Sequence, residues 1–186
     1  MDNISARLFA GIKSRPLYQA LTPDPDARAH LLLCDRNVPA VAWAETWVVA
    51  HDSRAIPEPG PRREFRSVTQ MLAALRHRLA TERVGLRLCA QGAEPFVWDV
   101  AAAGEAAGLG PGEIGLAHAG SLRRRVQCVH CKTMLADVAE SPVTCTGCGA
   151  ALAVRDHFSR RLGAFQGVAV DAEAPGERPA PELLYP

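Results

Sequence analysis

The sequence predicts an α/β protein with a small parallel sheet and flanking helices, followed by a separate metal-binding module. Three observations support this prediction. Short apolar runs typical of buried strands alternate with helical periodicity between residues 30 and 118. Four cysteines gather between Cys128 and Cys148. The chain has 186 residues, enough for one ordinary domain and a small module.

Composition is that of a soluble globular protein, with 48% hydrophobic residues, 22% charged residues and a net charge of +1. This balance excludes attraction of the whole surface to nucleic acid or membrane, so any basic effect is local. The N-terminus has no apolar signal region, and no apolar run reaches the roughly 18 residues of a membrane span. We expect a cytoplasmic protein with reduced thiols.

The first third of the chain holds two predicted strands. Prolines break residues 1–29, which we expect to form an N-terminal arm. His30–Asp35 is a short apolar run typical of a buried parallel strand. A second strand is expected in the C-terminal half of Val41–His51, and the proline-rich stretch 56–63 is expected to be a loop.

The next segments alternate between helix and strand. Ser67 is the expected N-cap of a helix whose apolar positions recur at spacings of three and four. A strand over 85–90, a helix over 95–107 ended by Gly108, and a strand over 113–118 complete the pattern. Strands separated by helices are expected to run parallel. Residues 1–121 are therefore predicted to be one α/β domain.

Two Cys-x-x-Cys turns are the strongest chemical signal. Cys128 and Cys131 form the first turn, and Cys145 and Cys148 form the second. Thirteen residues separate Cys131 from Cys145. Two such turns can build a tetrahedral S4 cage, which zinc prefers, and four thiolates close the shell, so the metal is expected to be structural. The alternatives are unbound thiols, a disulfide pair or a rubredoxin-like iron. His130, inside the first turn, is expected to face solvent.

The module around these cysteines is predicted to span 122–168, followed by a proline-rich tail over 169–186. A segment of this size buries too little apolar surface to fold alone, so metal binding is expected to fold it. Between residues 121 and 163 there are seven Lys or Arg and three acids. Such a basic module can bind nucleic acid weakly or dock on an acidic protein surface.

No catalytic constellation emerges from the spacing of the remaining residues. Cys34 and Cys89 lie in apolar strands, where buried core thiols are the common case. The glycine-rich turn that would let a strand–helix junction approach a pyrophosphate is missing, because Asp35–Pro39 contains no glycine. We expect a scaffold and a metal cage without a catalytic site in this chain.

Two resemblances refine these expectations. The order Leu86-Arg-Leu-Cys-Ala-Gln-Gly92, helix, Gly110-Pro-Gly-Glu-Ile114 turn and strand looks like the last third of the nicotinamide-binding domain of ferredoxin-reductase-type flavoproteins. That family has Cys-Gly-Pro after the strand, whereas this chain has Cys89-Ala90-Gln91 and lacks the flavin-binding domain. The resemblance implies a degenerate reductase-like NAD-binding domain.

The cysteine turns followed by Asp156-His-Phe-Ser-Arg-Arg-Leu-Gly-Ala-Phe-Gln-Gly167 resemble the C-terminal region of the small, DmmA-like subunit of dimethylamine monooxygenase. The resemblance implies a hetero-oligomeric enzyme that depends on haem, uses NADPH and oxygen, and demethylates dimethylamine to methylamine and formaldehyde. Haem, flavin and iron–sulfur centres are expected on partner subunits, namely a haem-bearing demethylase and a reductase. This chain would then be a non-catalytic or electron-transfer-assisting subunit.

Residue by residue, the same resemblance supports the four cysteines as zinc ligands. It also implies that one segment faces a partner: His157, Phe158, Ser159, Arg160 and Arg161. The alternative for this segment is an ordinary helix start, with Phe158 in the core and both arginines solvated.

Overall fold

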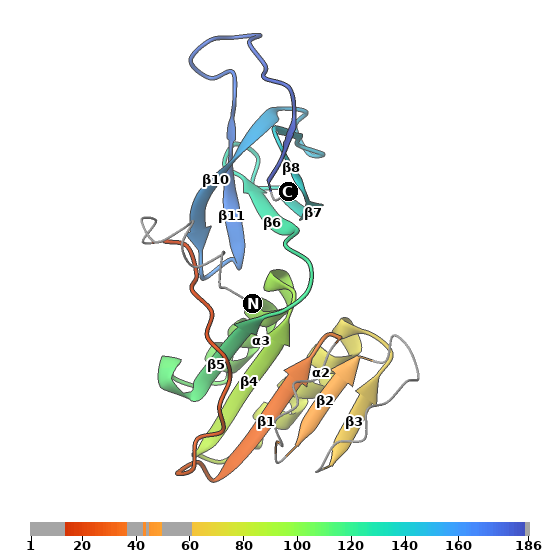
Figure 1. The fold of residues 1–186 in the computed structure, drawn as a ribbon, viewed down its shortest axis with the longest axis vertical. Helices are drawn as coiled ribbons and strands as arrows, with labels where there is room; N and C mark the ends of the chain where they lie inside the picture. The colour runs from red at the N-terminus through yellow and green to blue at the C-terminus, as the bar shows by residue number, and fades with distance from the viewer. Residues whose placement is uncertain (1–13, 37–42, 44, 50–60, 185–186) are drawn as a thin grey trace. The chain divides into compact units, whose positions relative to one another are not determined.

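The computed structural model describes residues 14–36, 43, 45–49 and 61–184, and they form two compact units. The first, which we call the α/β unit, comprises the described residues between 18 and 121. The second, which we call the ribbon unit, comprises 122–184 together with 14–17. Figure 1 shows the elements of each.

The α/β unit is built on one five-stranded sheet in the order β3-β2-β1-β4-β5. Every neighbouring pair is parallel, which confirms the predicted parallel sheet. This order is that of the first five strands of doubly wound dinucleotide-binding folds. The resemblance to a NAD-binding domain itself stays a prediction. The strands are β1 (Ala29–Cys34), β2 (Thr46–Val49), β3 (Arg62–Phe65), β4 (Leu86–Gly92) and β5 (Ile114–His118).

Strand β3 corrects the prediction of a loop over 56–63, of which residues 56–60 lie outside the described part. Arg62 and Arg63 belong to the strand, which lies at the edge of the sheet and, among the residues that the structure describes, pairs with β2 alone. An edge strand exposes much of its surface, so it lacks the apolar run by which a buried strand is recognised. Phe65 anchors it, with its ring centroid 5.1 Å from that of Trp47.

Two helices pack on one face of this sheet (Figure 1). Helix α2 (Val68–Leu79) contacts β2 and β3, and helix α3 (Glu94–Ala106) contacts β4, β5 and α2. The predicted cap of α2 is confirmed, because Ser67 Oγ accepts a hydrogen bond of 3.2 Å from the Gln70 amide. A short 3₁₀ helix, Pro111–Glu113, precedes β5.

The other face of the sheet carries a compact apolar cluster in the described residues. The buried side chains of Leu32, Cys34, Val48 and Cys89 come from the strands. Trp43 covers them, with Leu21 packed alongside. Cys34 and Cys89 are therefore core thiols, and burial raises the pKa of Cys89 to about 11.

The ribbon unit contains a second five-stranded sheet in the order β7-β6-β11-β10-β9. The β6–β11 pair is parallel and the other pairs are antiparallel. A separate two-stranded sheet joins β8 to β12, so the proline-rich tail returns to the unit at residues 182–183. The strands are β6 (Arg124–Cys128), β7 (Met134–Val138), β8 (Glu140–Ser141), β9 (Val143–Thr144), β10 (Ala151–Ser159), β11 (Ala164–Ala169) and β12 (Glu182–Leu183).

A partly buried ion pair, in which Arg124 is buried and Asp156 is half-exposed, lies in the ribbon unit. Arg124 is only 3% exposed, and its Nη1 lies 3.0 Å from Asp156 Oδ1. Its guanidinium lies 4.1 Å over the ring of Phe165, which meets Phe158 edge to face at 4.9 Å. Arg15 Nη1 reaches the same Asp156 oxygen at 3.1 Å, which ties residues 14–17 to this unit.

In the described residues, neither helix combines the length and the apolar character that crossing a membrane requires.

Candidate metal centre

The two Cys-x-x-Cys turns have the same backbone hydrogen bonding. In the first turn, the amide of Lys132 donates to Cys128 O at 2.9 Å, and the amide of Cys128 donates to Thr133 O at 2.9 Å. In the second, Gly149 donates to Cys145 O at 2.9 Å and Cys145 donates to Ala150 O at 2.8 Å. Lys132 and Thr133 therefore correspond to Gly149 and Ala150.

Each turn ends on a residue in the left-handed region. Gly149 has φ 75°, a conformation that glycine adopts at little cost. The corresponding residue of the first turn is Lys132, with φ 66°, a conformation that costs a residue with a Cβ more than it costs glycine. Lys132 Nζ donates to Val129 O at 2.6 Å, which fastens the turn.

The fold brings together all four cysteines that the sequence singled out. Their sulfurs all lie within 4.8 Å of one another. Cys128 Sγ lies 3.8 Å from Cys148 Sγ, and Cys131 Sγ lies 3.6 Å from Cys145 Sγ. A tetrahedral ion with metal–sulfur bonds of about 2.3 Å requires sulfur–sulfur separations of about 3.8 Å. The four sulfurs can thus hold one metal ion.

These separations do not fit disulfides, whose sulfurs lie about 2.05 Å apart, and all six cysteines are free. His130 is exposed and does not belong to the cluster of sulfurs. A shell of four thiolates leaves no position for water or substrate on a tetrahedral ion. The centre is therefore suited to holding the two turns together.

Hydrogen bonds distinguish the four thiols. The side chain and then the amide of Thr133 lower the pKa of Cys131 from 9.0 to about 6. The Ala150 amide lowers the pKa of Cys148, but burial and the other three sulfurs act in the opposite direction, and the pKa of Cys148 is raised to about 12. The first turn therefore offers the more readily ionised sulfur.

The segment expected to face a partner lies on β10 and the turn after it, rather than at a helix start. The alternative of a helix start is wrong, because β10 runs through Ser159 and pairs with β11. Phe158 is buried in the core, whereas His157, Arg160 and Arg161 are exposed. Ser14 Oγ lies 3.4 Å from His157 Nδ1. A docking role for the segment stays a prediction.

A structural residue that the sequence did not reveal lies after β1. Asp35 is 7% exposed, and its Oδ2 accepts a hydrogen bond of 3.0 Å from the amide of Ala93 at the start of α3. Gly92 allows this approach, because a Cβ there would overlap the Asp35 carboxylate. One sequence signal could have indicated this contact. Ala93 precedes the helix and has no side chain that could cap it, so a cap from elsewhere in the chain was to be expected.

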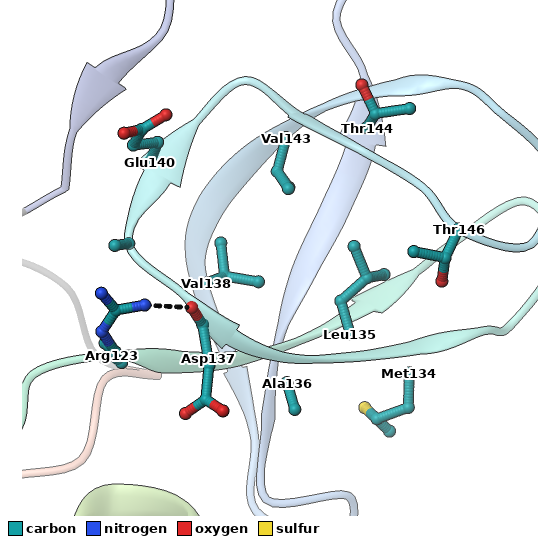
Figure 2. Close-up of a pocket in the computed structure, with 11 residues that line it drawn as sticks. Arg123, Met134, Leu135, Ala136, Asp137, Val138, Glu140, Val143, Thr144 and Thr146 are labelled. Atoms are coloured by element: carbon teal, nitrogen blue, oxygen red, sulfur yellow. Dashed lines mark hydrogen bonds between the residues drawn. The ribbon is translucent and has the colours of Figure 1, made fainter.

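A groove of ≈ 440 Å³ lies between β7 and the chain that follows it (Figure 2). Arg123 Nη1 donates to Asp137 O at 3.0 Å across one end. The lining contains neither cysteine nor histidine, so the groove is a surface feature of the ribbon unit and not a second thiolate or imidazole site. It is lined by Arg123, Met134, Leu135, Ala136, Asp137, Val138, Ala139, Glu140, Val143, Thr144 and Thr146.

Fold and site together define a class of protein: a parallel α/β unit joined to a β-rich unit with a closed four-cysteine site. Residues 125–168 match the family model described as "Dimethylamine monooxygenase subunit DmmA-like, C-terminal domain". This match, with the relative described next, confirms the resemblance to a DmmA-like subunit that the sequence predicted.

The chain is also similar to the "Heme-dependent oxidative N-demethylase delta subunit" of Ectopseudomonas mendocina (strain ymp), with 45% identity over 112 residues. The aligned part covers 60% of this chain and 64% of the relative, so the chain spans less than two thirds of the relative's length. No solved structure matches the chain.

Proposed function

We propose that this chain is a small subunit of a haem-dependent oxidative N-demethylase. The observation that carries the proposal is the 45% identity to a protein described as the delta subunit of such an enzyme. The DmmA-like domain over 125–168 points to the same assembly. The complex would use NADPH and oxygen to demethylate dimethylamine to methylamine and formaldehyde, in the cytoplasm.

Within this complex the chain has a non-catalytic role, either structural or assisting electron transfer. Cys128, Cys131, Cys145 and Cys148 hold zinc, and the ion supplies the cross-link that folds the ribbon unit. The closed shell of four sulfurs supports this role, because a catalytic ion needs an open position. Haem, flavin and iron–sulfur centres belong to the partner subunits.

NADPH is bound by the partner reductase and not by the α/β unit of this chain. Asp35 supports this assignment, because its carboxylate already holds the N-terminus of α3. In doubly wound folds the ligand lies in the crevice where the strand order reverses, which is between β1 and β4 in this sheet. A phosphate placed beside the Asp35 carboxylate would be repelled.

A protein partner fits the ribbon unit better than nucleic acid does. Arg124, one of the basic residues counted in the sequence, is buried and paired with Asp156. It therefore offers no charge to phosphates. Arg160 and Arg161 remain exposed beside His157 and form the proposed docking segment on the haem-bearing or reductase subunit.

A second candidate is an iron-based electron carrier of the rubredoxin type. Exposure of Cys148 favours it, because an exposed ligand brings the metal close to an external redox partner. Metal analysis and the visible spectrum of the aerobically purified chain separate the two candidates. Colourless protein with one zinc per chain supports the structural role, whereas stoichiometric iron with thiolate-to-iron absorption supports the carrier.

Reconstitution tests the assembly. The full chain, carrying an affinity tag, is co-expressed with the haem-bearing and reductase subunits, and dimethylamine-dependent NADPH oxidation is measured with and without it. We expect the subunits to co-purify in a fixed ratio and turnover to fall when the chain is omitted. A chain that stays monomeric and leaves turnover unchanged contradicts the proposal.

Charge reversal tests the docking segment in the same reconstituted complex. The double variant Arg160→Glu, Arg161→Glu is expected to co-purify less well with the partners and to become more sensitive to salt. Arg155→Glu, at an exposed position on β10 just before these two arginines, is the matched control. If both variants co-purify equally well, the docking surface is not formed by Arg160 and Arg161. The chain would still be a subunit of the complex.

A further inference from the structure

The two cysteine turns differ at one functional group. Thr133 and Ala150 occupy corresponding positions, and the amide of each donates a hydrogen bond to the sulfur of the second cysteine of its own turn. Thr133 adds a hydroxyl, and its Oγ1 lies 3.2 Å from Cys131 Sγ. Ala150 has no such group, so Cys148 receives only the backbone hydrogen bond from this position.

The second turn closes over the Thr133 hydroxyl. A Cβ added to Gly147 would overlap Thr133 Oγ1, would lie 2.9 Å from Thr133 Cβ and 3.2 Å from Cys131 Sγ. Space for the hydroxyl therefore depends on a glycine contributed by the opposite turn. Thr133 is half-buried in this position, and its rotamer is restricted by both turns.

We infer that Thr133 is a positioning residue of the metal centre, and that its hydroxyl makes Cys131 more firmly held than Cys148, the corresponding ligand of the second turn. The inference rests on the metal site of the proposed function. A hydroxyl that donates to a thiolate makes a charge-assisted hydrogen bond, which is stronger than a neutral one. Such outer hydrogen bonds orient metal ligands and commonly change metal affinity about 10-fold or more.

The consequence is an asymmetric centre. Cys131 is held by a hydroxyl and an amide beneath Gly147, whereas Cys148 is exposed. An incoming chelator or alkylating agent therefore reaches Cys148 first, and the metal leaves through the second turn while the first still holds it. Thr133 sets this order.

The test uses the full chain loaded with Zn²⁺ and three variants. Thr133→Ala removes the hydroxyl and reproduces the residue of the second turn. Thr133→Ser restores the hydroxyl, and Thr146→Ala removes an exposed threonine hydroxyl from the second turn as the matched control. Zinc transfer to a colorimetric chelator is followed in time, and alkylation of each cysteine by iodoacetamide is mapped by mass spectrometry.

We expect zinc to leave the Thr133→Ala variant about 10-fold faster, with Thr133→Ser and Thr146→Ala close to the wild type. In the wild type Cys148 is alkylated before Cys131, and Thr133→Ala removes the protection of Cys131. Circular dichroism of the zinc-loaded chains verifies that all variants fold. If Thr133→Ala instead fails to fold, Thr133→Ser and the labelling order in the wild type decide the question.

Unchanged zinc release in a folded Thr133→Ala variant, or wild-type labelling in which Cys131 reacts before Cys148, overturns the inference. Neither result affects membership of the demethylase complex, which co-purification measures. A wild-type chain that binds no metal would instead remove the metal role itself. Failure of the inference about Thr133 can therefore be distinguished from failure of the proposed function.

Discussion

Asp35 Oδ2 accepts a hydrogen bond of 3.0 Å from the Ala93 amide, so a carboxylate after β1 caps the helix that follows β4. β1 and β4 are adjacent in the sheet, with Cys34 opposite Gln91. The strand order reverses between these two strands, which is where open α/β sheets bind their ligands. In this chain a side chain of the protein fills that place.

The fit between Asp35 and Gly92 predicts a stability effect. Gly92→Ala places a Cβ against the Asp35 carboxylate and 2.8 Å from Phe96 Cδ1, so the core must shift. We expect a loss of about 1–3 kcal/mol in the free energy of unfolding. Gly112→Ala, at a position with open space, is the control and should change it by less than about 0.5 kcal/mol. Urea unfolding followed by tryptophan fluorescence measures both, and equal stability of the two variants contradicts the prediction.

The same carboxylate predicts that the α/β unit does not bind NADPH. Isothermal titration of the isolated full chain with NADPH should give no saturable heat, because a ligand in the crevice between β1 and β4 would face the Asp35 carboxylate. Saturable binding by the wild-type chain would show that the carboxylate does not block the site.

Metal removal should unfold one unit and spare the other. The three tryptophans, Trp43, Trp47 and Trp98, all belong to the α/β unit, so their fluorescence reports on that unit alone. A chelator should make 125–168 accessible to protease while the tryptophan spectrum stays constant, because metal binding supplies the folding free energy of the ribbon unit. Loss of both signals together would mean that the two units unfold cooperatively.

The buried Arg124 predicts a large effect in the ribbon unit. Arg124→Ala removes the ion pair with Asp156 and the contact with the Phe165 ring, and we expect a loss of about 2 kcal/mol in the free energy of unfolding. Arg155→Ala, on the exposed side of β10, should cost less than about 0.5 kcal/mol. Urea unfolding of the metal-loaded chain by circular dichroism compares them, and similar midpoints would contradict a structural role for Arg124.

Glu82 predicts a pH dependence of the α/β unit. Hydrogen bonds from the Arg83 amide and then from Arg78 lower its pKa from 4.5 to about 2. A lowered carboxyl pKa contributes stability that is fully present above pH 4.5 and is lost as the pH falls towards 2. Glu82→Gln should therefore destabilise the unit at neutral pH and flatten its stability between these values. Glu105→Gln, at an exposed position on α3, should leave the pH profile of the tryptophan-monitored midpoint unchanged.

Local signals accounted for much of the α/β unit. Ser67 as N-cap, the apolar face of α2 and the buried run before Asp35 all act within a few residues, so the sequence displays them. The edge strand β3 was missed, because Arg62 and Arg63 lack an apolar pattern and pair only with β2. Edge pairing depends on a neighbour that is remote in sequence.

In the ribbon unit, too, the sequence displays the local features and does not display those that depend on pairing between remote strands. Spacing alone singled out the four cysteines, because each turn places two sulfurs by local geometry. From the sequence, a helix start is the alternative for the stretch after Asp156, whereas the structure has a strand there through Ser159. Pairing of Phe158 with Phe165 across two strands decided it.

The sequence by itself determined an α/β unit with parallel strands, a four-cysteine cluster and a kinship with DmmA-like subunits, since these depend on periodicity, spacing and a distinctive motif. Only the tertiary structure decided that Asp35 caps α3, that Arg124 is buried against Asp156, and that Thr133 lies under Gly147 beside Cys131. The physical reason is the same in each case. A polar group is buried only where a partner, often distant in sequence, replaces its water, and the fold chooses that partner.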